Sequence, residues 1–544
     1  MTATSREPLL HVSGLTVPLP AGSDRPYAVR EVSFELRAGE ILCIVGESGS
    51  GKSVSANAIM GLLPSHLKPS AGRISFQQQD LLTLDEEALR ELRGRAIGMV
   101  FQEPMSALNP VMRVGDQIAE VMAVHGAYPG AARRQRVLEL LELVGLPDPP
   151  SLQHAHPHRL SGGQRQRVMI AMALALEPAV LIADEPTTAL DVTTQAQLLA
   201  LIQRIQAAKG MGVMFITHDF GVVADIADRV AVMEKGLLVE QGPAQQVLNH
   251  PQHPYTQRLI AAVPARGTGA SGGMPAIPAP ILEVKNLRKT YRSGGGWLAP
   301  RRIVHAVDDV SFTVPRGHTL GIVGESGSGK STIGKCLLRL TGIDGGQLLF
   351  EGQDIAPLKA HEFRPLRRHL QMVFQDPFAS LNPRHTVGRS IAAGPLANGV
   401  PAAEAEQRAR ELLRLVELDE SAYDRYPHAF SGGQRQRVGI ARALALNPKL
   451  LVADESVSAL DVSVQAQILK LLQDLQQRLQ LSMVFITHDL RVAAQICHDI
   501  VVMHQGRIVE RGAPEQVFDA PQHPYTQRLV GAIAGQHWRP MAAA

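Results

Sequence analysis

The sequence is 544 residues long, which exceeds one ordinary domain. A content of 45% hydrophobic and 19% charged residues is typical of a globular protein and excludes a chain that is disordered throughout. The 54 Lys and Arg residues nearly balance the 51 Asp and Glu residues, and the net charge of +3 comes with no basic block, so nucleic acid is not indicated as the main partner.

Three cysteines, Cys43, Cys336 and Cys497, lie far apart and form no paired spacing. This pattern fits a reducing compartment, the cytoplasm by default, and argues against a disulfide framework or a zinc site. The N-terminus lacks the apolar core of a signal peptide, and no stretch approaches the roughly 18 apolar residues of a membrane span. Work at a membrane would therefore require spans from another subunit.

Four sequence elements occur twice. They are VGESGSGKS from residues 45 and 323, SGGQRQRV from 161 and 431, FITHD from 215 and 485, and PQHPYTQRL from 251 and 521. The last three keep a constant separation of 270 residues. A repeat of this length predicts two copies of one domain, residues 1–263 and 282–544, joined by a Gly/Pro-rich linker over residues 264–281.

Short apolar runs alternate with longer helical patterns inside each copy. In the first copy the runs cover residues 41–45, 180–183 and 213–216. Continuous apolar runs of this length, without polar alternation, predict parallel strands that are buried on both faces. The expected fold class is therefore α/β, in two tandem copies.

The first apolar run of each copy leads into a loop with the spacing Gly, four residues, Gly, Lys, Ser. In this pattern glycines let backbone N–H groups converge on phosphate oxygens, the lysine neutralises the β and γ phosphates, and the serine hydroxyl binds Mg²⁺. A Gly-rich turn with a chance lysine is the alternative, but it does not explain two matches in the same context. The candidate ATP-binding residues are Gly46, Glu47, Ser48, Gly49, Ser50, Gly51, Lys52 and Ser53 in the first copy, and Gly324, Glu325, Ser326, Gly327, Ser328, Gly329, Lys330, Ser331 and Thr332 in the second.

Two adjacent carboxylates follow a later apolar run in each copy: Asp184 with Glu185, and Asp454 with Glu455. Successive residues of a strand point in opposite directions, so the pair can divide two functions. The aspartates, together with Ser53 and Ser331, suit a Mg²⁺ shell, and the glutamates suit polarisation of the attacking water. A solvated acidic turn is the alternative. The carboxylates follow a phosphate loop in the same copy, which favours the catalytic interpretation.

His218 and His488 end the apolar run of each FITHD element. A neutral imidazole there could bridge the γ-phosphate and the general base, so both are candidate catalytic residues. A structural histidine at a strand end is the alternative, since a duplication copies structural residues as well.

Between the phosphate loop and the acidic pair, LSGGQ and FSGGQ make each copy resemble a nucleotide-binding domain of the ATP-binding-cassette (ABC) family. The resemblance implies a P-loop NTPase fold of ABC type with an α-helical subdomain in each copy, and ATP and Mg²⁺ as cofactors. From the residues alone, Ser161 and Ser431 are expected to cap a helix. In the family this signature contacts the ATP of the opposite domain, so the two halves are expected to pair. The signature residues are Ser161, Gly162, Gly163 and Gln164, and Ser431, Gly432, Gly433 and Gln434.

The same resemblance assigns further positions. Gln102 and Gln375 match the glutamine loop, which touches Mg²⁺ or water and faces the membrane subunit, and Asp191 and Asp461 match the loop that crosses the dimer interface. Tyr291 fits the aromatic residue that stacks on adenine in the second half. The first half has Pro18 and Leu19 at that place, so either Tyr27 substitutes or stacking is weak there.

PQHPYTQRL and the segments ALNPVMRVGDQI and SLNPRHTVGRSI resemble the di- and oligopeptide importer group, especially members with two fused ATPases. The resemblance implies two membrane permease subunits, an extracytoplasmic substrate-binding protein, and a peripheral location on the cytoplasmic face of the inner membrane. Peptides or peptide-like compounds are the expected cargo, with glutathione or nickel as alternatives. A soluble tandem ABC protein acting on ribosomes or damaged DNA is the other class considered. The short neutral linker and the lack of cysteine pairs argue against it.

Two further motifs receive structural interpretations. Tyr255 and Tyr525 of PQHPYTQRL are expected to be core-packing aromatics rather than ligand contacts. His154, His156 and His158 alternate as zinc ligands can, but no fourth ligand is in view, so an extended segment leading into the signature helix is expected instead.

Overall fold

The computed structural model describes residues 8–188, 190–263, 279–293, 302–376, 380–458 and 460–538. Contacts divide these residues into two units. The first comprises residues 8–263 with the C-terminal tail 533–538, and the second comprises residues 279–532. The predicted linker lies outside the described residues up to 278, and its last two positions, Pro280 and Ile281, already belong to a strand.

Each unit contains a mixed sheet that is mainly parallel. In the first unit its order is β10 (Leu237–Pro243), β9 (Arg229–Glu234), β3 (Ile41–Val45), β8 (Gly212–Thr217), β7 (Val180–Asp184) and β6 (Ile97–Val100), with only β10 antiparallel to its neighbour. In the second it is β16 (Leu370–Val373), β17 (Leu450–Asp454), β18 (Ser482–Thr487), β13 (Thr319–Val323), β19 (Asp499–His504) and β20 (Arg507–Gly512). The three predicted strands of the first copy are therefore confirmed as β3, β7 and β8.

A second, antiparallel sheet lies in each unit. Its order is β2 (Tyr27–Arg37), β1 (Pro8–Pro18), β4 (Ala71–Phe76) and β5 (Gln79–Asp80) in the first unit. In the second it is β12 (Arg302–Pro315), β11 (Pro280–Ser293), β14 (Gly345–Phe350) and β15 (Gln353–Asp354). Apolar residues from both sheets share one core per unit, with Leu10 and Phe34 among those of the first.

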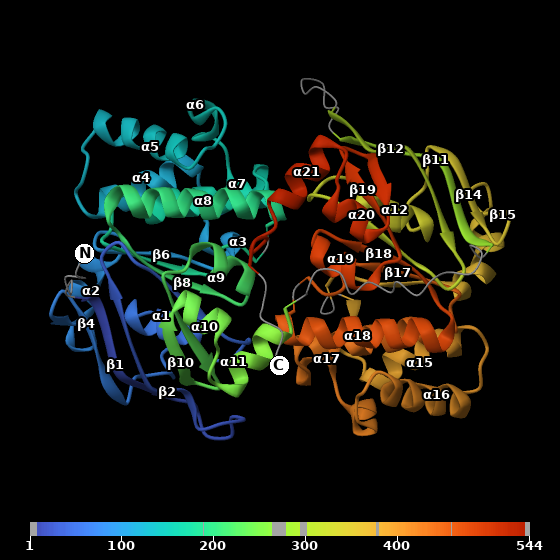
Figure 1. Ribbon diagram of the computed structural model, residues 1–544, viewed down its shortest axis with the longest axis horizontal. Coiled ribbons are helices and arrows are strands. Elements are labelled where there is room, and N and C mark those ends of the chain that lie inside the picture. The colour runs from blue at the N-terminus through green and yellow to red at the C-terminus, as the bar shows by residue number, and fades with distance from the viewer. Residues whose placement is uncertain are drawn as a thin grey trace. The chain divides into compact units, whose positions relative to one another are not determined.

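Each unit also contains helices, some of which cover its mixed sheet (Figure 1). Those of the first unit are α1 (Lys52–Ile59), α2 (Glu86–Leu92), α3 (Pro104–Ala107), α4 (Val114–Val124), α5 (Ala131–Leu143), α6 (Pro149–Leu152), α7 (Gly162–Ala173), α8 (Val192–Lys209), α9 (Phe220–Ile226), α10 (Ala244–Asn249) and α11 (Pro254–Ala261). Those of the second are α12 (Lys330–Leu337), α13 (Ala360–Phe363), α15 (Val387–Ala397), α16 (Ala402–Leu415), α17 (Gly432–Leu444), α18 (Val462–Leu479), α19 (Leu490–Ile496), α20 (Pro514–Asp519) and α21 (Pro524–Gly531).

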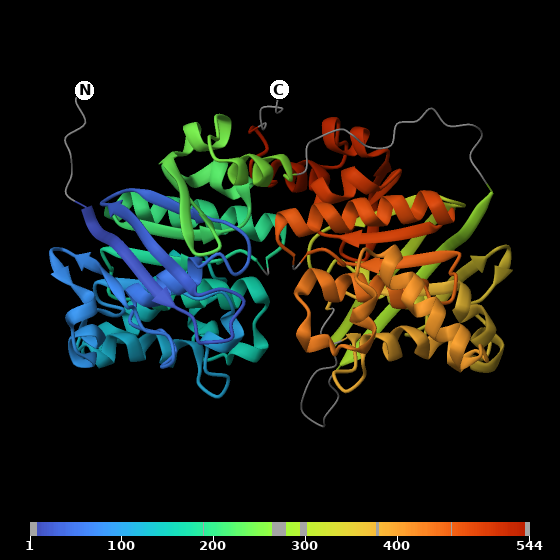
Figure 2. The ribbon, with the colours of Figure 1, turned by 90° about the horizontal axis from the view of Figure 1, so that it is seen from below.

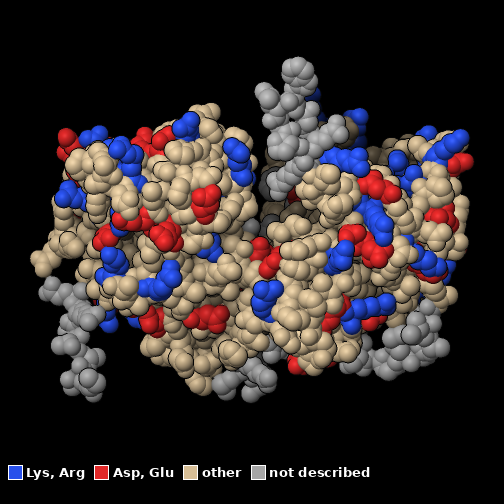
Figure 3. Space-filling view, turned by 90° about the horizontal axis from the view of Figure 1, so that it is seen from above, with Lys and Arg blue, Asp and Glu red and all other residues tan. Residues whose placement is uncertain are grey.

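A helical subdomain forms in each unit, as the family resemblance implied. Helices α4, α5 and α7 pack on one another in the first unit, and α15, α16 and α17 do so in the second (labelled in Figure 1; Figure 2 gives the view from below). Among the described helices, none combines the length and apolar composition needed to cross a bilayer. Lys and Arg side chains are interspersed with Asp and Glu on the face drawn in Figure 3, in keeping with the small net charge.

The tail after α21 packs with the first unit. The N–H of Gly535 donates to the carboxylate of Asp225 at 2.8 Å, and the indole N–H of Trp538 donates to the side chain of Asn249 at 3.1 Å. A Cβ on Gly535 would lie 2.6 Å from the Cα of Gly221, so the approach requires glycine. The tail is thus fixed to α9 and α10 through specific polar contacts.

The two units differ at the start of the strand that leads into the phosphate loop. In the first, the N–H of Ile41 donates to the carboxylate of Asp228 at 2.8 Å. In the second, the N–H of Thr319 donates to Nδ1 of His498 at 3.1 Å, and the His498 ring stacks on His318 with centroids 4.7 Å apart. Burial lowers the pKa of His498, and the charge of His318 lowers it further. The second unit therefore depends on a neutral imidazole where the first uses a carboxylate.

We expect the second unit to lose stability as the pH falls below about 6.5, the ordinary histidine pKa, because the unfolded chain then binds a proton that folded His498 resists. Above that pH both states are neutral and the effect vanishes. His498→Asn keeps an acceptor that does not titrate. Hydrogen exchange of the β13 amides at about pH 7.5 and 5.5 should show a smaller acid-induced loss of protection in the variant. An equal loss in both proteins would contradict this account.

Candidate functional site

The predicted phosphate loop joins β3 to α1. Gly46 begins the loop with φ +152°, and a Cβ there would collide with the carbonyl oxygen of Met233 in β9. Gly51 ends it with φ +104° as the N-cap of α1. Glycine is therefore required at both ends of the turn. The second unit repeats these conformations at Gly324 and Gly329.

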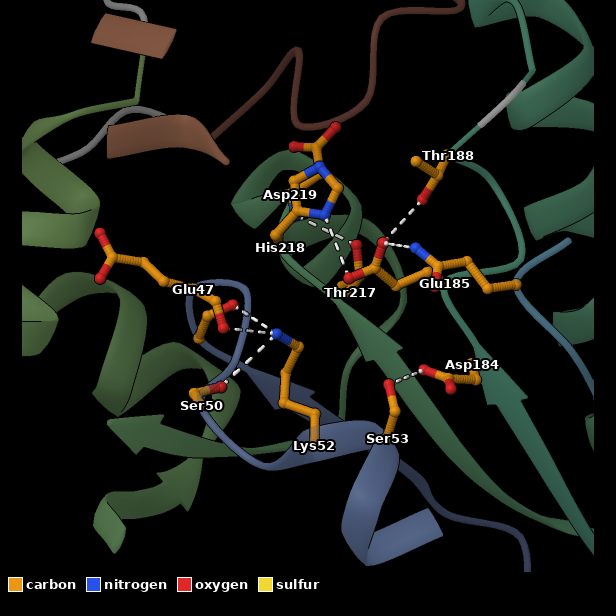
Figure 4. Close-up of polar contacts among 12 residues, drawn as sticks. Glu47, Ser50, Lys52, Ser53, Asp184, Glu185, Thr188, Thr217, His218 and Asp219 are labelled. Atoms are coloured by element: carbon orange, nitrogen blue, oxygen red, sulfur yellow. Dashed lines mark hydrogen bonds and ion pairs between the residues drawn. The ribbon is translucent and has the colours of Figure 1, made fainter. Parts of the chain in front are cut away.

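The loop lysines are buried and turned onto the loop itself. Lys52 is 5% exposed, and its Nζ donates to the carbonyl oxygens of Gly46 at 2.7 Å and Glu47 at 2.9 Å (Figure 4). Lys330 makes the same contacts at 2.6 and 2.7 Å. Each unit thus holds one ammonium group against two backbone carbonyls of the loop, at the N-terminus of a helix.

An oxygen pair lies beside each lysine. Ser53 Oγ donates to Asp184 Oδ1 at 3.0 Å, and Ser331 Oγ donates to Asp454 Oδ1 at 2.9 Å. Burial raises the pKa of both aspartates, and the serine hydrogen bond only partly offsets it. Hydroxyl and carboxylate oxygens are the ligands that Mg²⁺ prefers, so this pair fits the cation that the sequence predicted.

The acidic residue after each aspartate has a different set of partners. Glu185 accepts from Gln102 Nε2 at 2.9 Å and from Thr188 Oγ1 at 3.0 Å, and its Oε1 lies 3.4 Å from Nδ1 of His218. Burial raises the pKa of Glu185, but the hydrogen bond and charge of His218 outweigh it and bring the pKa to about 2. This carboxylate is therefore ionised and fixed in orientation.

The second unit repeats this arrangement. Glu455 accepts from Gln375 Nε2 at 2.7 Å and lies 3.6 Å from Nδ1 of His488. The pKa of Glu455 is lowered, because His488 outweighs the effect of burial. The pKa of His488 is raised by Glu455, against its own burial. The contact with Glu455 thus stabilises the protonated form of the His488 imidazole.

Both glutamates have a backbone conformation that the sequence did not indicate. Glu185 and Glu455 each have φ +45°, in the left-handed region that costs a non-glycine residue about 1 kcal/mol or more. Their N–H groups donate to the carbonyls of Ile216 and Ile486 in the adjacent strands. The hydrogen bonding between the strands therefore continues to the glutamate itself, the first residue of the turn. This backbone bond helps to fix the direction of each carboxylate.

The signature serines cap helices as predicted. Ser161 begins α7 through a capping box in which its Oγ accepts from Gln164 N–H at 3.2 Å and Gln164 accepts from Ser161 N–H at 3.0 Å. Ser431 does the same for α17. Gly162 has open space beside its Cα, whereas a Cβ on Gly163 would lie 2.7 Å from Thr194 of α8. Only the first glycine thus leaves room for a ligand.

The remaining predicted positions have clear places. Asp191 caps α8 by accepting from Thr194 N–H at 2.9 Å. Tyr291 is 41% exposed with Lys289 Nζ 5.5 Å from its ring centroid. Tyr27 pairs across the strands with Pro18, which puts an aromatic beside the place where the first half lacks one.

The two motifs with structural interpretations differ in outcome. The predicted extended segment at His154, His156 and His158 is wrong in detail, because a 3₁₀ turn, Pro157–Arg159, begins at Pro157, whose ring fixes the backbone φ. The rings of His156 and His158 stack on each other. The burial of Tyr255 is confirmed at 4% exposure. Its hydroxyl reaches the phosphate loop, a contact that sequence reasoning missed.

A family model described as ABC transporter matches residues 29–188 and 307–458. The chain belongs to the ABC transporter family. A second model, described as Oligopeptide/dipeptide transporter, C-terminal region, matches residues 239–288 and 509–539. This tandem ABC protein is therefore an ATP-binding subunit with ATPase activity coupled to transport.

Curated relatives resemble this ABC protein over nearly the whole chain. It is 48% identical over 541 residues to the Peptidoglycan transport ATP-binding protein YejF of Agrobacterium fabrum, covering 98% of this chain and 97% of the relative. It is 49% identical over 562 residues to the Glutathione import ATP-binding protein GsiA of Salmonella typhimurium, covering 96% and 89%. The protein of the same name from Escherichia coli O157:H7 is 47% identical over 561 residues, with the same coverage.

Ser456 distinguishes the second ABC half, because the first has Pro186 after its glutamate. The Ser456 side chain is 2% exposed, and its hydroxyl has no hydrogen-bond partner among the residues that the structure describes. We expect Ser456→Ala to raise the free energy of unfolding by about 1 kcal/mol, because it removes an unsatisfied buried hydroxyl. Ser458→Ala is the matched control and should lower it, because Ser458 Oγ donates to the Glu455 carbonyl at 3.0 Å. Urea unfolding of the full chain measures both, and destabilisation by Ser456→Ala would contradict the assignment.

Proposed function

We propose that this ABC protein drives import of peptides or peptide-like compounds through separate membrane permeases. The observation that carries the proposal is the oligopeptide/dipeptide transporter region, which occurs once in each half. Relatives named for peptidoglycan transport and for glutathione import support it, because both named cargoes contain peptide bonds. Glutathione is therefore the specific second candidate.

The proposed roles follow the geometry of each half. Lys52 and Lys330 hold the β and γ phosphates of ATP, and Glu185 and Glu455 orient the attacking water, each carboxylate held by its histidine and glutamine. Ser53 with Asp184, and Ser331 with Asp454, hold Mg²⁺, which when bound neutralises phosphate charge. Tyr291 stacks on adenine in the second half, and Tyr27 takes that role in the first.

We further propose that the two halves act as a pair. The nucleotide-binding domains cover residues 1–263 and 282–544, with the linker between them. Each signature serine, Ser161 or Ser431, contacts the ATP held by the phosphate loop of the other half. Closure around two ATP molecules and reopening after hydrolysis then give one transport step. A location on the cytoplasmic face of the inner membrane, with two permeases and an extracytoplasmic binding protein, completes the proposal.

Exposed apolar side chains beside the glutamine loop support contact with a permease. In the first half Phe101 is 39% exposed, Met105 of α3 is 54% exposed and Val111 is 80% exposed. Phe374, next to Gln375, is 39% exposed in the second. Apolar side chains left open beside a residue that contacts the catalytic carboxylate are suited to carry closure of the site to a partner.

Substitution of the catalytic groups tests the roles. Glu185→Gln or Glu455→Gln should lower turnover at the altered site by about 10²-fold or more, because an amide cannot accept a proton from water. The double variant should retain bound ATP. Lys52→Ala with Lys330→Ala should abolish ATP binding and hydrolysis. Steady-state ATPase assays and filter binding of labelled ATP measure these effects. Undiminished hydrolysis in the double lysine variant would falsify the assignment.

Reconstitution tests the cargo. The protein should co-purify with membrane permeases rather than with ribosomes. In vesicles containing the complex and its binding protein, short peptides should stimulate ATPase activity several-fold. Stimulation by glutathione alone would select the second candidate, and co-purification with ribosomes would reject an import function.

A further inference from the structure

The PQHPYTQRL element is anchored to the sheet by one carboxylate in each half. In the first, Glu240 of β10 accepts the N–H groups of Gln252 at 2.8 Å and His253 at 3.1 Å. His253 Nδ1 then caps α11 by accepting the N–H of Tyr255 at 3.2 Å. Glu510, Gln522, His523 and Tyr525 repeat these contacts in the second half. The element therefore places one tyrosine in a fixed position.

The hydroxyl of this tyrosine lies against the phosphate loop. The N–H of Glu47, the second residue of the loop, donates to Tyr255 Oη at 3.1 Å, and the Tyr255 O–H donates to Glu47 Oε2 at 3.4 Å. The N–H of Glu325 donates to Tyr525 Oη at the same 3.1 Å. Burial raises the pKa of Tyr255, so the phenol keeps its proton and can donate. Each tyrosine thus fixes a backbone group of the loop.

The hydrogen bond is common to both halves, although the surroundings of the ring are not. Arg258 lies over the Tyr255 ring at 5.9 Å and pairs with Glu234 at 3.6 Å. In the second half His504 takes the place of Glu234 and stacks on Tyr525 with centroids 3.9 Å apart. The side chains are 4% and 3% exposed. Packing of the ring alone would not require the hydroxyl to reach the same loop N–H in two different environments.

We infer that Tyr255 and Tyr525 are positioning residues of the two ATP sites, which hold the first turn of the phosphate loop ready for ATP through the N–H of Glu47 or Glu325. This inference rests on the proposed assignment of these loops as the ATP sites. It gives the C-terminal region of each half a direct role in ATP binding. A second contact of the same residue supports this inference: the carbonyl of Glu47 accepts a hydrogen bond from the loop lysine, Lys52.

Removal of the hydroxyl tests the inference. Tyr255→Phe together with Tyr525→Phe should raise the KM for ATP about tenfold, the effect of one unpaired buried N–H, while kcat at saturating ATP stays within about twofold. Thr256→Val is the matched control. It removes a fully buried hydroxyl that has no partner in the described part of the chain, from the next position of the same helix, and it should leave KM unchanged. Hydrogen exchange of the Glu47 and Glu325 amides should rise only in the tyrosine variants.

Each site can be examined alone with the fluorescent analogue mant-ATP. Tyr255→Phe in a Lys330→Ala background reports on the first site, and Tyr525→Phe in a Lys52→Ala background reports on the second. About tenfold weaker binding at each is expected. Unchanged KM and binding, or a lower kcat at unchanged KM as a purely structural role would give, overturns the inference. Unchanged binding in the Lys52→Ala, Lys330→Ala chain would instead overturn the site assignment itself.

Discussion

The register of three adjacent parallel strands is the constraint on which the rest of each half depends. In the first half β3 pairs with β8 so that Val45 lies opposite Thr217, and β7 pairs with β8 so that Asp184 lies opposite Ile216. The phosphate loop, the acidic pair and His218 lie at the carboxyl ends of β3, β7 and β8, respectively. A slip of one residue would turn each side chain to the opposite face of the sheet and separate Ser53 from Asp184. The fully buried strands prevent such a slip, because their apolar residues have no alternative environment.

At this edge of the sheet, neighbouring carboxylates have different environments, which shift their pKa values in opposite directions. Asp184 and Glu185 are consecutive, yet burial dominates for the first and raises its pKa, whereas the contact with His218 dominates for the second and lowers its pKa. The difference follows from the left-handed turn at Glu185, which directs its carboxylate to His218 and Gln102 while Asp184 stays on the strand beside Ser53. Backbone geometry thus separates the two functions that the sequence assigned to the pair.

Most of the fold, and the positions that make up the candidate site, could be predicted from local sequence patterns. The features that could not be predicted depend on contacts between residues far apart in the sequence. Buried parallel strands appear as continuous apolar runs, and a phosphate loop or a helix cap needs only its own few residues. The left-handed turn at Glu185 cannot be predicted from a local pattern, because its N–H is bound by the carbonyl of Ile216, 31 residues away. The hydroxyl of Tyr255 bonds a residue 208 positions earlier. Tyrosine burial followed from hydrophobicity, but the direction of its one polar atom follows from α11 and Glu240.

The two halves share the polar groups of the candidate site and differ in the residues that surround those groups. The oxygen pairs, the lysine contacts and the glutamine contacts agree within about 0.2 Å between halves, within the ordinary spread of hydrogen-bond lengths. The halves differ at positions around these groups: Pro186 is replaced by Ser456, Asp228 by His498, and Glu234 by His504. A change at these neighbouring positions alters the stability of the scaffold and its response to pH, while the proposed catalytic groups keep their places. Since one chain carries both copies, such differences are fixed in every molecule, and each site can acquire its own stability without losing its chemistry.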